Sequence, residues 1–111
     1  MAIVWINKLP VDSRIAAEKF ARTFNAPRIC QFYDPQQLSG RAVADNLGWQ
    51  GRVAWDIYLF YTAGSQWNET PPVPFDWMHQ LTDHWADSER LRMGDDLVRE
   101  LAKSMKKLVG K

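Results

Sequence analysis

The chain has 111 residues, of which 46% are hydrophobic and 24% are charged, and its formal net charge is +1 at pH 7. A chain of this length has room for one modest core, so we expect residues 1–111 to form a single globular domain. The near-neutral charge gives no electrostatic reason to expect nucleic acid or an anionic membrane as a partner. With a single cysteine, an internal disulfide is excluded.

The N-terminal segment MAIVWINKLP has no basic region followed by a long apolar run, so no secretory signal is predicted. The longest apolar run, residues 53–61, is far shorter than the roughly 20 residues of a membrane-spanning helix. These two observations predict a soluble protein of the cytoplasm that does not associate with membranes.

The first third of the chain predicts a strand, a helix and a second strand. Residues 2–6 are apolar and partly β-branched, which favours a short buried strand. Residues 10–27 predict an amphipathic helix that is capped by Asp12 or Ser13 and ends near Asn25. Its apolar face contains Ala16, Phe20 and Phe24, with Ile15 beside them. Residues 28–33 predict the second strand.

The middle of the chain predicts a second helix and a third strand. Asp34 and Pro35 mark a helix start, and this helix would bury Leu38, Ala42 and Leu47 and stop at Gly48. Residues 53–61 predict a central strand because both alternating faces are largely apolar. Residues 62–74 then predict an irregular loop stiffened by Pro71, Pro72 and Pro74.

The last third predicts two helices. The first would bury Phe75, Met78, Leu81 and Trp85, and the second, over residues 95–111, would bury Leu97, Leu101, Met105 and Leu108. The full pattern predicts an α/β fold with a small three-stranded parallel or mixed sheet in β-α-β-α-β order, followed by two C-terminal helices.

Several chemistries lack a sequence signal. The glycines form no phosphate-binding motif, so no cofactor is expected. His79 and Asp83 would lie one turn apart on the predicted helix, but a solvated polar face explains them, and no metal is expected. The C-terminal lysines complement the dipole of the last helix, which removes the main reason to expect nucleic acid. Cys30 is interpreted as a buried, inert strand residue, with a thioredoxin-like thiol role as a minor alternative.

Asp56 is the sharpest candidate for chemistry, because it sits between Trp55 and Ile57 in the predicted central strand. Desolvation there would suit it to acid–base work. The favoured interpretation is structural: a polar residue with satisfied hydrogen bonds that fixes strand register or loop position. The alternative is a small enzyme or ligand carrier, with a small molecule in an aromatic pocket formed by Trp55, Asp56, Tyr58, His79 and His84.

The chain is rich in tryptophan, with six, and five of them fall between Trp49 and Trp85. Tryptophan is enriched at the anchors of protein interfaces. A proline-stiffened loop also loses less entropy on binding. The leading hypothesis is therefore a non-catalytic protein-binding module, an accessory or regulatory subunit whose partner is another protein subunit. Its binding residues would be Trp67, Pro71, Pro72, Phe75 and Trp77; the competing interpretation is that this segment covers the sheet and closes the core.

Overall fold

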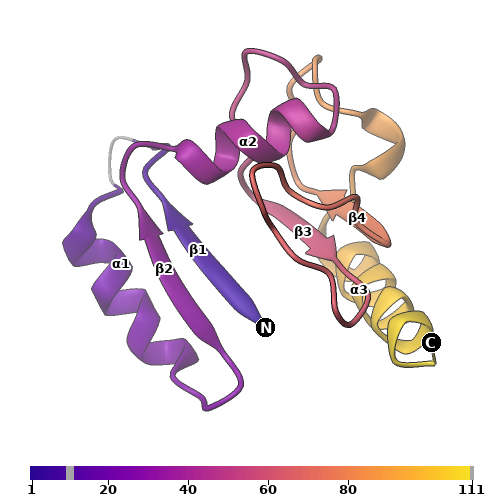
Figure 1. The fold of residues 1–111 in the computed structure, drawn as a ribbon, viewed down its shortest axis with the longest axis horizontal. Helices are drawn as coiled ribbons and strands as arrows, with labels where there is room; N and C mark the ends of the chain where they lie inside the picture. Colours follow the sequence, from indigo (N-terminus) through magenta and orange to yellow (C-terminus); the bar gives the residue numbers. More distant parts are fainter. Residues whose placement is uncertain (10–11, 111) are drawn as a thin grey trace.

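The computed structural model describes residues 1–9 and 12–110. Residues 10, 11 and 111, which belong to the predicted first and last helices, lie outside the described residues. The fold is mixed α/β, and its described part contains three α-helices and four strands in two small sheets (Figure 1). In chain order the elements are β1 (Ala2–Ile6), α1 (Arg14–Ala21), β2 (Cys30–Asp34), α2 (Leu38–Asn46), β3 (Ile57–Phe60), β4 (Asp76–His79) and α3 (Gly94–Val109), with short 3-10 turns η1 (Arg22–Phe24) and η2 (Ser88–Arg90).

The predicted three-stranded sheet is wrong, although its first two strands are correct. β1 and β2 pair in parallel, with Ala2 opposite Cys30. The third predicted strand is only four residues long and forms a separate antiparallel sheet with β4. β4 occupies the segment for which the sequence predicted a helix from Phe75 onward. The spacing of apolar residues there suits a helix, but pairing with β3 satisfies the same backbone groups and decides the structure.

The N-terminal half is built around Trp5, which lies on the face of β1 that α1 covers. The Trp5 ring stacks on Phe20 at 6.0 Å and contacts Phe24 at 5.9 Å between ring centroids. Its indole Nε1 donates a hydrogen bond to Gln31 Oε1 at 2.8 Å, which satisfies the polar atom of a half-buried ring. These contacts attach α1 to the β1–β2 sheet.

In the predicted first helix, the cap is correct but the buried face is not. Ser13 caps the helix as expected, because its hydroxyl accepts a hydrogen bond from the amide of Ala16 at 3.0 Å. The apolar face is rotated from the predicted one: Ala17 is buried, whereas Ile15 is 79% exposed. The helix also ends earlier, at Ala21, and continues as the 3-10 turn η1.

The Asp34 side chain bonds the first amides of α2, but the predicted cap position is wrong: the helix starts three residues later than expected, and its N-cap residue is Gln37, in a left-handed conformation. The Asp34 carboxylate accepts hydrogen bonds from the amides of Leu38 at 3.0 Å and Ser39 at 2.8 Å, and from the Ser39 hydroxyl. Burial raises the pKa of Asp34, but the hydroxyl and backbone hydrogen bonds from Ser39 and the amides of Leu38 and Gly40 outweigh it, so the net pKa is lowered.

This lowered pKa predicts a loss of stability in acid. A carboxylate with a depressed folded-state pKa stabilises the fold fully above the unfolded value, and this contribution is lost as the pH falls through the folded value. Asp34→Asn keeps a capping side chain but removes the titration. We expect the wild type to lose more unfolding free energy than Asp34→Asn between about pH 5 and pH 3, as measured by urea denaturation at each pH. Equal losses in the two proteins would contradict the lowered pKa of Asp34. The pKa values of Asp12 and Asp76 are also lowered, but these residues contribute equally to both proteins.

Helix α2 joins the two halves of the molecule, and Gly40 is its point of closest approach (Figure 1). A Cβ at Gly40 would lie 2.7 Å from the carbonyl oxygen of Ala54, from Ile6 of β1 and from Val53. Gly40 also accepts a hydrogen bond from the amide of Ala54 at 2.9 Å. Glycine has a low helix propensity, but the close packing at position 40 leaves no room for a side chain and therefore requires it.

The core lies in the C-terminal half, between α2 and the segments around the β3–β4 sheet. Its buried residues are Val43, Ala44, Trp49, Ala54, Leu81 and Ala86. Leu38, predicted to point inward from α2, is 65% exposed. None of the helices within residues 1–9 and 12–110 is long and apolar enough to cross a membrane.

Helix α3, predicted correctly, is fixed to β4 by a polar cluster. The Asp76 carboxylate accepts hydrogen bonds from the hydroxyl of Ser104, from Arg90 Nη1 at 3.2 Å and from the amide of Trp77 at 2.9 Å. Burial raises the pKa of Asp76, but these hydrogen bonds and the Arg90 charge lower it overall. Because Ser104 is 2% exposed, this cluster fixes both the position and the rotation of α3.

Candidate functional site

Three of the six tryptophans form one cluster inside the C-terminal half. Trp49 lies at its centre and contacts Trp77 and Trp85 edge-to-face, each at 5.4 Å between ring centroids. The guanidinium of Arg90 lies 4.5 Å above the Trp77 ring, and that of Arg52 lies 5.3 Å above the Trp85 ring. These contacts place Trp77, which is partly buried, in the packing against the core rather than on an exposed surface.

His79 is the most deeply buried large side chain and shows no exposed area. Its Nδ1 accepts a hydrogen bond from the amide of Leu81 at 2.9 Å, and its Nε2 lies 2.7 Å from the carbonyl oxygen of Asp87. Because Nδ1 accepts, the proton sits on Nε2 and is donated to that carbonyl. Both ring nitrogens are thus occupied by backbone groups, and the ring packs against Trp49 at 5.5 Å.

The pocket and metal arrangements that the sequence suggested depend on a helix that is absent from this segment. His79 lies on β4, whereas Asp83 and His84 lie in the following turn and are exposed. The one-turn stacking of His79 and Asp83 therefore does not occur. Within the described ranges 1–9 and 12–110, no group of three or more histidine, cysteine, aspartate or glutamate side chains could hold a metal ion.

Asp56 is exposed and lies just before β3, so the expected desolvated position inside a strand is wrong. It adopts a left-handed conformation with φ of 50°. Its carbonyl oxygen accepts a hydrogen bond from the amide of Gln80 at 3.1 Å, and its carboxylate accepts one from Gln80 Nε2 at 3.0 Å. These bonds hold the end of the β3–β4 hairpin in register, as in the structural interpretation of this residue.

Gln80 connects Asp56 to Tyr58, because its Nε2 also donates to the Tyr58 hydroxyl oxygen at 3.0 Å. Burial and then the Asp56 charge raise the pKa of Tyr58, while the Gln80 hydrogen bond lowers it, and the net shift is upward. Trp55 is half-buried, with the amino group of Lys8 at 5.9 Å from its ring centroid. The sequence did not single out Gln80, since it lies in the segment predicted to be a helix from Phe75 onward; the β3–β4 pairing is the signal that identifies it.

Cys30 is exposed on β2, in contrast to the buried position that the sequence predicted. β2 pairs with β1 along one edge, and α1 covers only one face of this two-stranded sheet. The face with Cys30 also carries Val4, 45% exposed, and Phe32, 57% exposed. A prediction of burial on both faces assumed a third strand and a second covering helix, which this sheet lacks.

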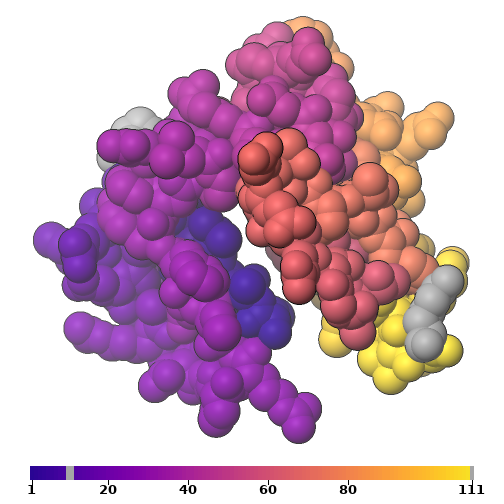
Figure 2. All heavy atoms as spheres, viewed as in Figure 1, coloured from indigo at the N-terminus to yellow at the C-terminus, as the bar shows by residue number. Residues whose placement is uncertain are grey.

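The proline-containing loop over residues 61–74 is held by one hydrogen bond from the last residue of α2 and by one that joins the two ends of the loop. Asn46 Nδ2 donates to the carbonyl oxygen of Pro71 at 3.2 Å, and the amide of Phe75 donates to the carbonyl oxygen of Phe60 at 2.6 Å. Pro71 is buried, and Pro72 and Phe75 are partly buried. Trp67 is instead 48% exposed. Figure 2 shows this part of the chain bordering a hollow opposite the N-terminal half.

The predicted partner-binding residues therefore divide into two groups. Trp67 faces solvent from a held loop, whereas Pro71 and Trp77 belong to the packing that holds it. Val73, which the sequence did not single out, is 84% exposed in the same loop.

An open groove of about 300 Å³ lies between α1 and β2, and its lining contains none of the residues discussed so far in the C-terminal half. It is lined mainly by Trp5, Arg14, Ala17, Glu18, Gln31 and Tyr33. None of the five residues proposed for an aromatic pocket lines it. No family model, curated protein or solved structure matches this chain.

Proposed function

We propose that this chain is a non-catalytic protein-binding module, an accessory or regulatory subunit that docks on another protein through the loop over residues 61–74. The observation that carries the proposal is the amount of exposed surface. A compact monomer of this mass exposes roughly 6,300 Å². This chain, at 12.9 kDa, exposes 8111 Å². The excess, roughly 1,800 Å², exceeds the roughly 800 Å² that one partner buries in a standard interface.

The loop is the part of this surface best suited to be the anchor. Trp67 supplies a large amphipathic ring of the type that dominates binding energies, and Val73, six residues further along the loop, adds a second exposed apolar side chain. The hydrogen bond from Asn46 to Pro71 and the burial of Pro71 order the loop before binding. The loop therefore loses less conformational entropy on binding a partner than a flexible loop would.

Trp67→Ala is expected to remove partner binding and to leave the fold intact. Loss of a central tryptophan anchor lowers affinity by about 2–4 kcal/mol, or about 30-fold to 1000-fold. Because Trp67 is 48% exposed and belongs to no core cluster, the midpoint of urea unfolding should remain within experimental error. Binding is measured by capture of the tagged chain's stoichiometric partner from the cells that produce it, followed by titration with the purified partner.

The matched control is Ile15→Ala, which truncates an apolar side chain that is 79% exposed on α1. The control should bind the partner as the wild type does. If Trp67→Ala unfolds the protein, the loop covers the core and the proposal fails. A chain that remains alone while binding a small molecule would instead support the ligand-carrier alternative.

A further inference from the structure

Strand β2 has an outer edge, on the side away from β1, where backbone groups are unpaired. In the parallel pairing with β1, the amide of Cys30 donates to the carbonyl oxygen of Met1 at 2.9 Å. The N–H and C=O groups of one strand residue point to the same side, and successive residues alternate. The amides and carbonyl oxygens of Gln31 and Tyr33 therefore face outward, and within residues 1–9 and 12–110 they take part in no hydrogen bond.

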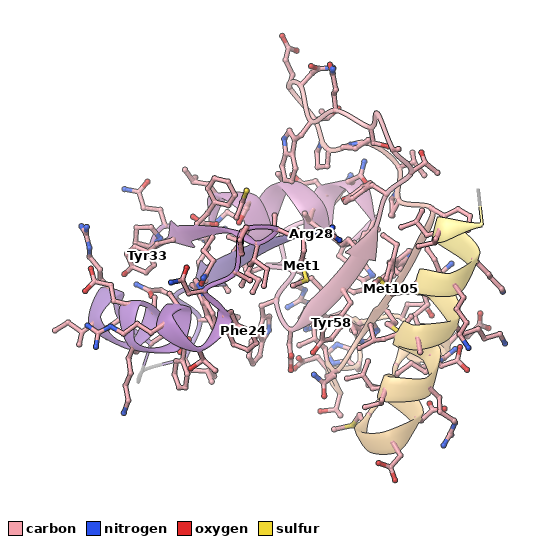
Figure 3. All side chains as sticks on the ribbon, turned by 90° about the horizontal axis from the view of Figure 1, so that it is seen from below. Met1, Phe24, Arg28, Tyr33, Tyr58 and Met105 are labelled. Atoms are coloured by element: carbon pink, nitrogen blue, oxygen red, sulfur yellow. The ribbon has the colours of Figure 1, made fainter. Side chains whose placement is uncertain are left out.

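The groove of about 300 Å³ between α1 and β2 follows this outer edge. Its lining contains Gln31, Phe32 and Tyr33, three successive residues whose side chains alternate between the two faces of the sheet. A groove that touches all three lies at the edge of the strand rather than over one face. The opposite wall is α1, which contributes the small side chains of Ala17 and Ala21. Figure 3 shows α1 on one side of the sheet, with Tyr33 labelled near the end of β2.

The β1–β2 sheet is unusually open for a parallel sheet. Parallel sheets are almost always covered on both faces, whereas here one face is bare, with Val4 45% and Phe32 57% exposed. Proteins usually protect an exposed strand edge with lysine, proline or a bulge. Residues 30–33, CQFY, contain no lysine or proline, and they pair with β1 in continuous register. The edge of β2 is therefore ready to accept another strand.

The unpaired backbone groups determine which kind of ligand fits. An extended chain can hydrogen-bond to each of them, while its alternate side chains enter the groove and lie beside Phe32. A small molecule would stay largely exposed in so open a groove. The outer edge of β1 is a poorer site, because Ile6 at its end lies against Gly40 of α2 and the groove beside it measures only about 130 Å³.

We propose that the outer edge of β2 binds an extended peptide segment of a protein partner as a third strand of the β1–β2 sheet. The peptide hydrogen-bonds to the amides and carbonyl oxygens of Gln31 and Tyr33. In this mode of strand addition, the main chain supplies affinity and the side-chain pockets supply specificity. The site goes beyond the proposed function, because it lies in the N-terminal half and does not use the loop over residues 61–74.

The test is a titration of the full chain with a labelled peptide of about eight residues that alternates valine and threonine, since β-branched residues favour the extended conformation. Fluorescence anisotropy of the label should show saturable binding. The same peptide with every backbone amide N-methylated should bind at least about tenfold more weakly, because it can donate no hydrogen bond to the edge. A peptide methylated only at every second residue keeps one edge able to pair, so its affinity should be nearly unchanged.

Amide hydrogen exchange locates the bound peptide. Saturating peptide should slow exchange at the amides of Gln31 and Tyr33 by at least about tenfold, because both become hydrogen-bonded. The amide of Phe32 faces β1 and serves as the internal control, with little change expected.

Tyr33→Pro and Tyr33→Ala are the matched variants, because both remove the tyrosine ring and only proline also removes the outward N–H. An outward-facing edge position tolerates proline, and urea denaturation checks that both proteins fold. Tyr33→Pro should bind the unmethylated peptide about tenfold more weakly than Tyr33→Ala. If Tyr33→Pro does not fold, the methylated peptides decide the question.

Absence of peptide binding, or equal binding of the unmethylated and fully methylated peptides, would overturn the inference. Equal affinities of the folded proline and alanine variants would do the same. A dimer in sedimentation velocity that Tyr33→Pro disrupts, without peptide binding, would overturn it in favour of a second copy of the chain. Trp67→Ala should bind the peptide as the wild type does, so each of these outcomes leaves the test of the proposed function unaffected.

Discussion

Replacing His79 with leucine is expected to lower the free energy of unfolding by about 3–5 kcal/mol. The leucine side chain fills a similar space but leaves the amide of Leu81 and the carbonyl oxygen of Asp87 without their partner. Each unpaired buried group costs about 1–3 kcal/mol. The edge-to-face contact with Trp49 is lost as well and contributes about 0.5–1.5 kcal/mol. The measurement is urea denaturation followed by far-ultraviolet circular dichroism.

His84→Leu is the matched control, because it makes the same substitution at an exposed histidine five residues further along the chain. Its unfolding free energy should remain within about 0.5 kcal/mol of the wild type. If His79→Leu proved as stable as this control, His79 would not be the hydrogen-bonded core residue described above.

Gly40→Val is expected to be the other severe substitution, with a loss of about 3 kcal/mol in unfolding free energy. The added Cβ would lie 2.7 Å from three neighbours, and one of them is the backbone oxygen of Ala54, which cannot move aside by rotating a side chain. Relief of the clash requires α2 to shift away from both β1 and the segment before β3. Differential scanning calorimetry should therefore show a lower melting temperature.

Gly110→Val provides the comparison, because a Cβ at that position meets its nearest atom at 3.4 Å, at the exposed end of α3. It should leave the melting temperature within a few degrees of the wild type. A Gly40→Val protein as stable as Gly110→Val would show that α2 does not approach the two halves as closely as described.

The parts of the fold that the sequence predicts well are those controlled by local signals. The β1–α1–β2 unit follows from a capping serine, an apolar strand and a proline-marked turn, and α3 follows from a long amphipathic stripe with charges that match its dipole. In these segments the local preference and the tertiary packing agree, so reading the residues in order is sufficient.

The segment from Phe75 to Trp85 shows where local reading fails. Its apolar residues fit a helical period, yet Asp76–His79 forms a strand because β3 offers backbone partners from 16 or more residues away. Pairing at this separation leaves no mark in the local pattern. The errors at His79 and Gln80 derive from this one assignment, since the neighbours of both residues depend on the hairpin. The error at Asp56 has another cause, because the strand predicted from residue 53 begins only at Ile57.

Besides the strand pairing, the sequence could not show which side chains are buried. Cys30 and Phe32 have the alternation and composition of core strand residues, and both are exposed because the β1–β2 sheet has one uncovered face. Trp67 and Trp77 look equivalent in sequence, and only their contacts separate an exposed ring from one enclosed by Trp49 and Arg90.

The tryptophans also place intrinsic optical probes in different parts of the molecule. Trp49, Trp77 and Trp85 lie close enough for their electronic transitions to couple, so their near-ultraviolet circular dichroism reports the closure of one region as a unit. Trp5, held between Phe20 and Phe24, reports the N-terminal half. The emission of Trp67 senses water at the loop. The tryptophan signals of the chain, to which Trp55 also contributes, therefore combine contributions from both halves and from the loop.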